Sequence, residues 1–236
     1  MRQRLTVLVL AGVSGLAVGC STVVGGKAVP ADHSGPLPQN PVAVAALDGL
    51  LLDAGQINTA LNAASMKVGF SAKGMWDWSS SISDKDCLPL DGPAQDNVYA
   101  GSGWTAIRGQ RLDDSVDDSK TRNHYAIQAV VAYPSARDAN AFYDSSAQSW
   151  SACANRRFSD LPEGKPPVVW TVAGINKVSG TLSTSEVQEG GDGWSCQRAL
   201  TVRNNVAIDV LACAAPLAAG PAVDIAEQIA AKVARQ

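Results

Sequence analysis

The chain has 236 residues, of which 46% are hydrophobic and 17% charged, and this balance is typical of a globular protein rather than a disordered one. The length suffices for one sizeable core and is short for two domains. A net charge of −3 without a basic cluster in the sequence argues against nucleic-acid binding, and no apolar run beyond residue 20 is long enough to cross a bilayer.

The N-terminus has the pattern of an export signal over residues 1–19, with two positive charges followed by an apolar run. The run ends in Leu16-Ala17-Val18-Gly19-Cys20, which resembles the lipobox of bacterial lipoproteins. That resemblance implies cleavage before Cys20, diacylation of its sulfur and lipid anchoring to the cell membrane on its extracytoplasmic face. The alternative is an ordinary signal peptide in which Cys20 has no role.

Residues 20–41 are rich in Gly, Pro and Ser and show no periodic apolar pattern, so we expect a flexible tether after the lipidated cysteine. His33 lies in this segment and is interpreted as solvated. The folded part is therefore predicted to be a single domain over residues 42–236.

The first half of that domain is predicted to alternate between helix and strand. Apolar residues at helical spacing predict a helix over 42–66, and Asp53 with Gln56 has the pattern of a capping box at which a new helix could begin. A strand is expected within 66–78, a polar loop over 79–97 and a strand through Ile107. Over 125–133 both alternating sets of side chains are largely apolar, which predicts a central strand covered on both faces.

A helix is predicted after Pro134, with Ser135 as N-cap and Asp138 in its first turn. One face of this helix is expected to be buried: Ala139, Phe142, Tyr143, Ser146, Trp150 and Cys153. Strands are predicted over 168–173, 177–184 and 186–189, and a final helix after Gly220-Pro221. This order predicts an α+β fold, an antiparallel β-sheet with helices packed on it.

A central hairpin is predicted over 194–213, because two strand-like runs flank Asn204-Asn205 and Asn tolerates the backbone of a two-residue turn. Pairing Arg203 with Val206 places Cys196 opposite Cys213, in the kind of pair where side chains approach closest.

Cysteine usage supports export. Without Cys20 four cysteines remain, and an even number in an exported chain predicts two disulfides. The hairpin register selects Cys196–Cys213 and leaves Cys87–Cys153. The alternative, a four-cysteine zinc site, lacks any CxxC pair, so we expect no metal.

Catalytic signatures are missing from the sequence after the signal. It contains no GxSxG, HExxH, phosphate-binding loop or dinucleotide-binding glycine pattern, and His124, at the start of a strand, is interpreted as structural. The acidic run Asp113, Asp114, Asp117 and Asp118 lacks calcium-loop spacing and is interpreted as a solvated loop. A hydrolase could use a pair of carboxylates, but no pattern selects one pair among the 22 acidic residues. We therefore expect neither an enzyme nor a cofactor.

Several short motifs recur together in order and spacing. They are Leu50-Leu51-Leu52, Ile57-Asn58, Asp86-Cys87-Leu88, residues 98–104, Arg108-Gly109-Gln110, residues 150–153, residues 193–200 and Arg203-Asn204-Asn205. With them, residues 45–235 resemble the extracellular sensor domain of PknH-type mycobacterial receptor serine/threonine kinases and its stand-alone lipoprotein relatives. The resemblance implies an α+β fold, two disulfides and an open cleft suggested to bind a ligand. Autophosphorylation is not implied, because no kinase domain or transmembrane helix is recognised in the sequence.

Four residues are candidates for ligand binding. In the hairpin register Arg198 and Asp209 are diagonal neighbours on the face that also carries Trp194, and Trp104 follows a Gly-Ser-Gly segment. The alternatives are a structural salt bridge covered by Trp194, and a core role for Trp104.

These observations predict a non-enzymatic sensor of the cell envelope. Its expected ligand is a small molecule, an envelope lipid or a glycan, and an envelope protein partner is a further expectation. The alternatives are an accessory protein that supports an envelope enzyme or transporter by protein contact, and an unrecognised hydrolase.

Overall fold

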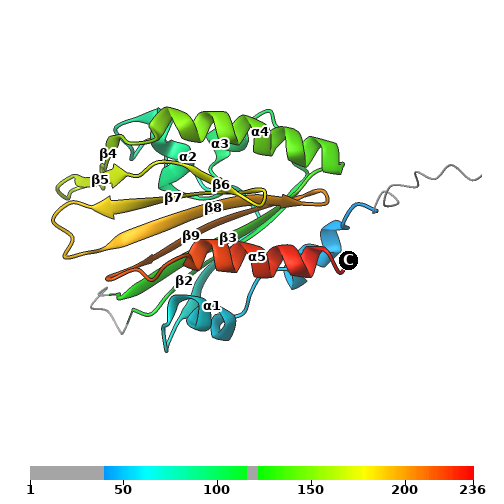
Figure 1. The fold of residues 1–236 in the computed structure, drawn as a ribbon, viewed down its shortest axis with the longest axis horizontal. Helices are drawn as coiled ribbons and strands as arrows, with labels where there is room; N and C mark the ends of the chain where they lie inside the picture. Colours follow the sequence, from blue (N-terminus) through cyan, green and yellow to red (C-terminus); the bar gives the residue numbers. More distant parts are fainter. Residues whose placement is uncertain (1–39, 116–121) are drawn as a thin grey trace, which may run out of the picture. The chain divides into compact units, whose positions relative to one another are not determined.

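The structure is a computed structural model that describes residues 40–115 and 122–236. Its centre is a nine-stranded antiparallel sheet in the order β1-β2-β3-β9-β8-β7-β5-β4, with β6 paired to β7 (Figure 1). The strands are β1 (Lys67–Ala72), β2 (Ala106–Asp113), β3 (His124–Ala132), β4 (Arg157–Asp160), β5 (Val168–Val172), β6 (Asn176–Val178), β7 (Thr181–Gln188), β8 (Ser195–Arg203) and β9 (Val206–Ala214). The predicted α+β class with an antiparallel sheet is confirmed.

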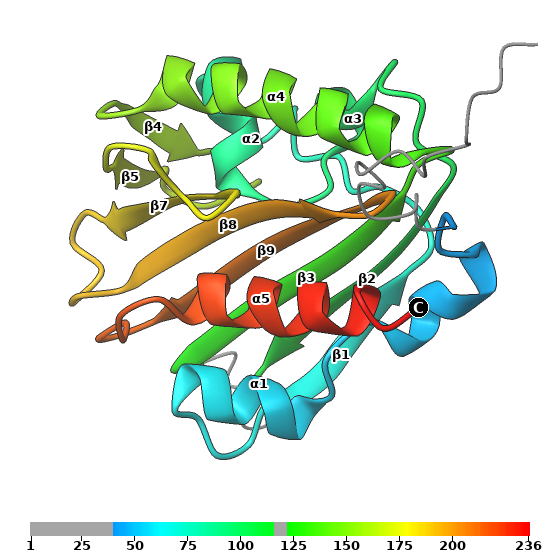
Figure 2. The same cartoon turned by 45° about the vertical axis from the view of Figure 1, so that its right-hand side comes forward.

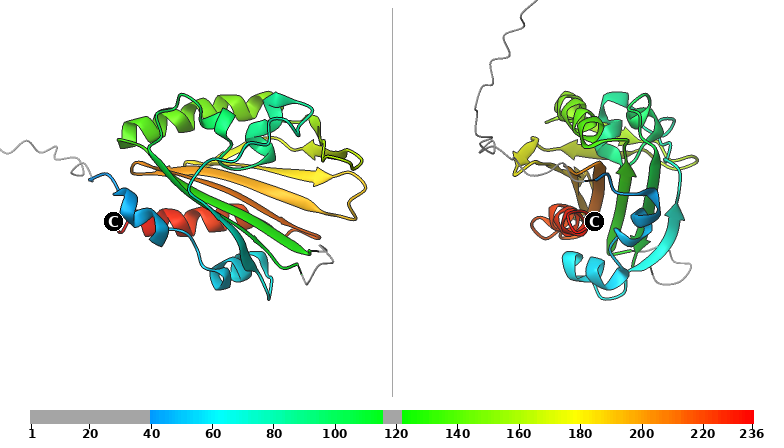
Figure 3. Two further views of the ribbon diagram at one scale, coloured as in Figure 1. Left: turned by 180° about the vertical axis from the view of Figure 1, so that it is seen from behind. Right: turned by 90° about the vertical axis from the view of Figure 1, so that its right-hand side faces the viewer.

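Helices cover both faces of the sheet. They are η1 (Val44–Gly49), α1 (Ala54–Leu61), η2 (Lys85–Cys87), α2 (Leu88–Asp91), α3 (Asp96–Tyr99), α4 (Ala136–Cys153) and α5 (Pro221–Val233). In Figures 2 and 3, α4 lies with α2 and α3 on one face, and α5 lies with α1 on the other. Each face has its own hydrophobic core.

Strand β3 is buried on both faces, as its pattern predicted. Ile127 and Val131 belong to the core under α4, whereas Ala126 and Val130 belong to the core under α5. A sheet with a helical layer on each side leaves its central strands without a solvated face, so their sequences lose the polar half of the alternation.

The predicted N-terminal helix is divided in two. The Asp53 carboxylate accepts a hydrogen bond from the Gln56 backbone N–H at 2.9 Å, and the Gln56 side chain accepts one from the Asp53 N–H at 3.1 Å. This capping box begins α1, while residues 44–49 form the separate turn η1. The restart expected at Asp53 is confirmed.

The central hairpin has the predicted register. Arg203 pairs with Val206, and Cys196 pairs with Cys213, whose Cα atoms are 4.0 Å apart within a disulfide. Asn204 has a φ of 53°, in the left-handed region that Asn tolerates. The turn chemistry and the register therefore agree.

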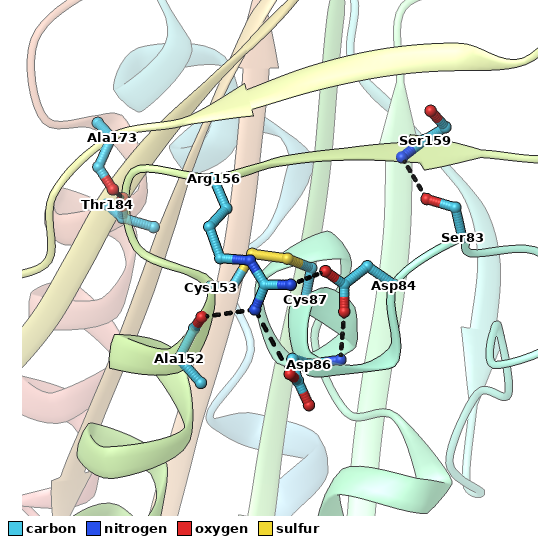
Figure 4. Close-up of a disulfide and its surroundings, with 10 residues drawn as sticks. All are labelled: Ser83, Asp84, Asp86, Cys87, Ala152, Cys153, Arg156, Ser159, Ala173 and Thr184. Atoms are coloured by element: carbon cyan, nitrogen blue, oxygen red, sulfur yellow. Dashed lines mark hydrogen bonds and ion pairs between the residues drawn. A yellow bond between two sulfur atoms is a disulfide. The ribbon is translucent and has the colours of Figure 1, made fainter.

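The second predicted disulfide, Cys87–Cys153, joins η2 to the end of α4 (Figure 4). Helix α4 begins at the Ser135 cap and buries the six residues expected, Cys153 among them. Arg156 adds an ion pair to Asp84 and donates to the Ala152 carbonyl oxygen at 2.8 Å. The segment before α2 is thus fixed beneath α4 by one covalent and several polar links.

Two strand predictions need correction, and one strand was missed. The segment 177–184 is not one strand, because Ser179 and Gly180 have positive φ and form the turn between β6 and β7. Residues 186–188 continue β7 rather than form a strand of their own, and β4 was not predicted. Val178 and Leu182 stand an even number of residues apart on the two sides of the turn, as they would in one continuous strand, so periodicity alone did not locate the turn.

Across residues 40–115 and 122–236, no helix combines the length and hydropathy that a membrane span requires. The predicted signal segment, Cys20 and His33 lie outside the described residues.

Candidate functional site

One row of side chains crosses four strands on the α4 side of the sheet. Tyr125 of β3 pairs with Cys213 of β9, Cys213 with Cys196 of β8, and Cys196 with Glu186 of β7. Residues paired in register point to the same face, so the disulfide lies between the Tyr125 ring and the Glu186 carboxyl group.

A cavity of about 310 Å³ opens over this row, within the size range of small-molecule sites. We call it the Glu186 cavity. Its lining consists of four aromatic residues, three acidic residues, one arginine, the disulfide and three further residues: Trp78, Trp170, Trp194, Tyr125, Asp91, Asp160, Glu186, Arg122, Cys196, Cys213, Ser81, Pro162 and Leu211. These lining residues come from segments that are far apart in the sequence. For this reason no short sequence motif predicts the cavity.

Glu186 is the buried acid of the cavity. Its residue is 3% exposed, and its Oε2 atom has no hydrogen-bond partner among the described residues. Burial raises the pKa of Glu186 well above its ordinary value, and the charge of Asp91 raises it further, while Arg198 acts in the opposite direction. A buried acceptor with an open position is a site where a ligand can contribute the missing donor.

Asp91 and Asp160 form a second acidic group in the same cavity. Burial is the main cause that raises the pKa of Asp91, followed by the nearby carboxyl group of Asp160. Asp160 Oδ2 accepts a hydrogen bond from Trp170 Nε1 at 2.8 Å. The indole therefore holds the Asp160 carboxyl in place beside Asp91.

The four predicted ligand-binding residues lie in different environments. Trp194 lines the Glu186 cavity, whereas Trp104 is half-buried against the core under α4 and does not line it. Arg198 and Asp209 are 1% and 4% exposed, and they are bonded to each other at 2.8 Å beneath the surface. These contacts favour the alternative of a structural salt bridge for the pair.

His124 and Asp114 form a separate pair at the start of β3. The Asp114 carboxylate accepts hydrogen bonds from the backbone N–H groups of Asn123 and His124, both at 2.9 Å, and its Oδ2 lies 2.7 Å from His124 Nδ1. Burial would raise the pKa of Asp114, but these hydrogen bonds outweigh it and lower the pKa. These contacts agree with a structural role for His124. Of the acidic run that was interpreted as a solvated loop, Asp117 and Asp118 lie outside the described residues.

The acidic residues of the cavity were missed by sequence reasoning. Asp91 ends α2, within a segment that was predicted to be a polar loop. Asp160 ends β4, which was not predicted, and Glu186 lies inside β7, where two separate strands were expected. One signal could have located Glu186: it pairs with Cys196 across β7 and β8, so extending the predicted hairpin by one strand would have placed it beside the disulfide. Within the part of the chain that the structure describes, no three His, Cys, Asp or Glu side chains group closely enough to hold a metal ion.

A family of known domains matches residues 42–232, described as "PknH-like extracellular domain". The chain belongs to this family. The PknH-like domain is 37% identical over 196 residues to the serine/threonine-protein kinases PknH of Mycobacterium bovis and Mycobacterium tuberculosis (strain CDC 1551 / Oshkosh). That alignment covers 83% of this chain and spans 31% and 30% of those kinases.

A solved structure extends the likeness to three dimensions. The crystal structure of the extracellular domain of PknH from Mycobacterium tuberculosis superposes with a TM-score of 0.78 at 36% identity, covering 84% of this chain and 99% of that one. The PknH-like domain therefore shares the fold of that extracellular domain over almost the whole length of that chain, as the resemblance implied.

Proposed function

We propose that this PknH-like domain is a non-enzymatic sensor module at the extracytoplasmic face of the cell membrane, held there by a lipid on Cys20, and that its ligand binds in the Glu186 cavity. One observation carries the ligand-binding part: a cavity of about 310 Å³ holds three tryptophans and a buried carboxyl group, one oxygen of which has no partner in the described part of the chain. Large aromatic surfaces with a few polar groups are the usual composition of a small-molecule site.

Membership of an extracellular domain family supports the location, and the two disulfides are consistent with an oxidising compartment. The lipobox-like segment supports the anchor. If Cys20 is lipidated, the mature wild-type chain begins at Cys20, carries a diacylglycerol mass and fractionates with membranes, whereas Cys20→Ala lacks that mass. A wild-type chain without a diacylglycerol mass would contradict the anchor.

Native mass spectrometry tests the sensor proposal on the full chain, expressed with its own signal and solubilised in detergent. We expect a co-purified envelope molecule with the wild type and its loss in Trp194→Ala. Trp104→Ala is the matched control, because it removes the same side chain from a half-buried position outside the cavity.

Two results would contradict ligand binding in this cavity. One is an adduct that is lost equally from both tryptophan variants. The other is an adduct-free mass together with no thermal shift across panels of envelope lipids and glycans. The second result would favour function by protein contact instead.

A further inference from the structure

We infer that the Glu186 cavity selects an organic ammonium ion, held between its carboxyl groups and its indole rings. The inference rests on the proposed ligand-binding function and names the chemical class of the ligand.

Three acidic residues line the cavity against one basic residue, Arg122. Arg198 lies beneath the floor, where the Asp209 carboxylate balances its charge: its guanidinium donates to Asp209 at 2.8 Å and to the Pro89 carbonyl oxygen at 3.0 Å, and its Nε has no partner among the described residues. The lining therefore has an excess of acids. In their ionised forms these acids repel an anion and attract a cation, and a bound cation in turn stabilises the ionised forms.

The open position on Glu186 defines where the cation would bind. Its Oε2 atom has no partner among the described residues, and the residue is 97% removed from solvent. An ammonium N–H group, or the polarised methyl groups of a quaternary ammonium, would complete the surroundings of this oxygen. Hydrogen bonds to charged groups are about twice as strong as neutral ones.

The aromatic walls suit the same ligand. Trp78, Trp170 and Trp194 present indole rings to the cavity, and a ring face attracts a cation within about 6 Å of its centre. Tyr125 already does so, because the Arg122 guanidinium carbon lies 4.4 Å from its ring centroid. This wall of the cavity thus accepts a positive charge in the structure itself.

A neutral polyol could also stack on the indoles and donate to Glu186, but it would leave the acids uncompensated.

The groups that act electrostatically on Glu186 are Asp91, Asp160 and Arg198, while Tyr125 and Arg122 lie across the cavity. Burial and mutual repulsion favour the protonated forms of Glu186 and Asp91 in the free protein. An ammonium ion reverses this preference, so its binding releases protons and strengthens as the pH rises. A neutral polyol releases no protons when it binds, so its affinity should not depend on pH in this way.

Choline and its uncharged isostere 3,3-dimethylbutan-1-ol test the inference on the full chain. Indole N–H resonances report the site, with Trp78, Trp170 and Trp194 expected to shift and Trp104 as the internal reference. We expect choline to bind about tenfold more tightly than the alcohol, corresponding to one hydrogen bond or ion contact to a charged group. Its affinity should rise with pH while that of the alcohol stays constant.

Three variants sharpen the test. Glu186→Gln keeps the shape and removes the ionisable group, so choline should bind about tenfold more weakly. Glu163→Gln makes the same change at an exposed residue outside the cavity and should leave affinity unchanged. Arg122→Gln removes the competing cation and should strengthen choline binding, the opposite sign to Glu186→Gln.

Equal affinity of choline and the alcohol at the three indoles would overturn cation selection while the ligand-binding function stood. Cation selection would also be overturned if choline shifted none of the three indole resonances while an envelope molecule still co-purified with the wild type. Unchanged choline affinity in folded Glu186→Gln, shown by a melting temperature no lower than that of the wild type, would also overturn it.

Discussion

Arg198 donates a hydrogen bond from Nη2 to Asp209 Oδ1 at 2.8 Å, and both side chains are almost completely buried between the sheet and the segment 88–99. The other carboxylate oxygen of Asp209 accepts from the Ala94 N–H at 2.9 Å and the Tyr99 hydroxyl at 3.0 Å. Ala94 has a φ of 52°, an unfavourable region for a residue with a Cβ. The ion pair thus fixes a strained segment that also carries Asp91, one wall of the Glu186 cavity.

Replacing Arg198 by alanine should destabilise the fold strongly. The change leaves the Asp209 charge buried without its cation, and breaking a buried pair in this way costs about 3–5 kcal/mol. Urea unfolding measures the loss, with the exposed Arg203→Ala on the same strand as control, expected within about 0.5 kcal/mol of wild type. Normal stability together with lost ligand binding would instead support a direct ligand role for Arg198.

Gly92→Ala should disturb the wall formed by Trp78. A Cβ atom on Gly92 would lie 2.1 Å from Trp78 Cζ3, so the indole must move, at a cost of about 1–3 kcal/mol. Gly49→Ala is the control, because a Cβ there meets no atom within 4 Å. We expect the Trp78 indole resonance and ligand affinity to change in Gly92→Ala alone. Wild-type stability and an unmoved Trp78 resonance would show that the contact relaxes freely.

Removing either disulfide by paired Cys→Ser substitutions should lower stability without rearranging the other. The bonds close segments with sequence separations of 17 for Cys196–Cys213 and 66 for Cys87–Cys153. The loop-entropy model gives about 3 and about 4 kcal/mol for them. Denaturant unfolding measures the loss, and peptide mapping of the oxidised variants identifies the remaining bond. Cross-connected cysteines in the wild type would contradict the pairing.

The buried acid should make stability depend on pH in a defined direction. Below 4.5, the ordinary pKa of glutamate, Glu186 is protonated whether the chain is folded or not. Above that value the unfolded carboxyl ionises while the buried one keeps its proton, because its pKa is raised. The free energy of unfolding should then fall by up to about 1.4 kcal/mol per pH unit until the raised pKa is passed.

Glu186→Gln removes this dependence, so the melting temperatures of variant and wild type should diverge as the pH rises above 4.5, with the variant the more stable. Asp91, whose pKa is also raised, leaves a residual slope that Asp91→Asn should reduce. Parallel pH profiles for wild type and Glu186→Gln would show that Glu186 ionises in the folded protein as readily as in the unfolded chain.

Local patterns predicted the elements whose determinants lie within a few residues of each other. The Asp53 capping box, the buried face of α4 and the hairpin around Asn204 follow from backbone geometry and side-chain periodicity, and the hairpin register also paired Cys196 with Cys213. The same reasoning failed at Ser179 and Gly180, which form the turn between β6 and β7. Side-chain periodicity does not show where a chain reverses its direction.

The candidate site is only partly a property of the sequence. The chain by itself determined that Trp194, Arg198 and Asp209 share one face of the hairpin. Only the tertiary structure decided that Arg198 and Asp209 are enclosed by segment 88–99 while Trp194 lines an open cavity. It also brought Asp91, Asp160 and Glu186 together from α2, β4 and β7. Strand order and loop placement depend on contacts between distant segments, and residues near in space but far apart in the chain leave no local pattern.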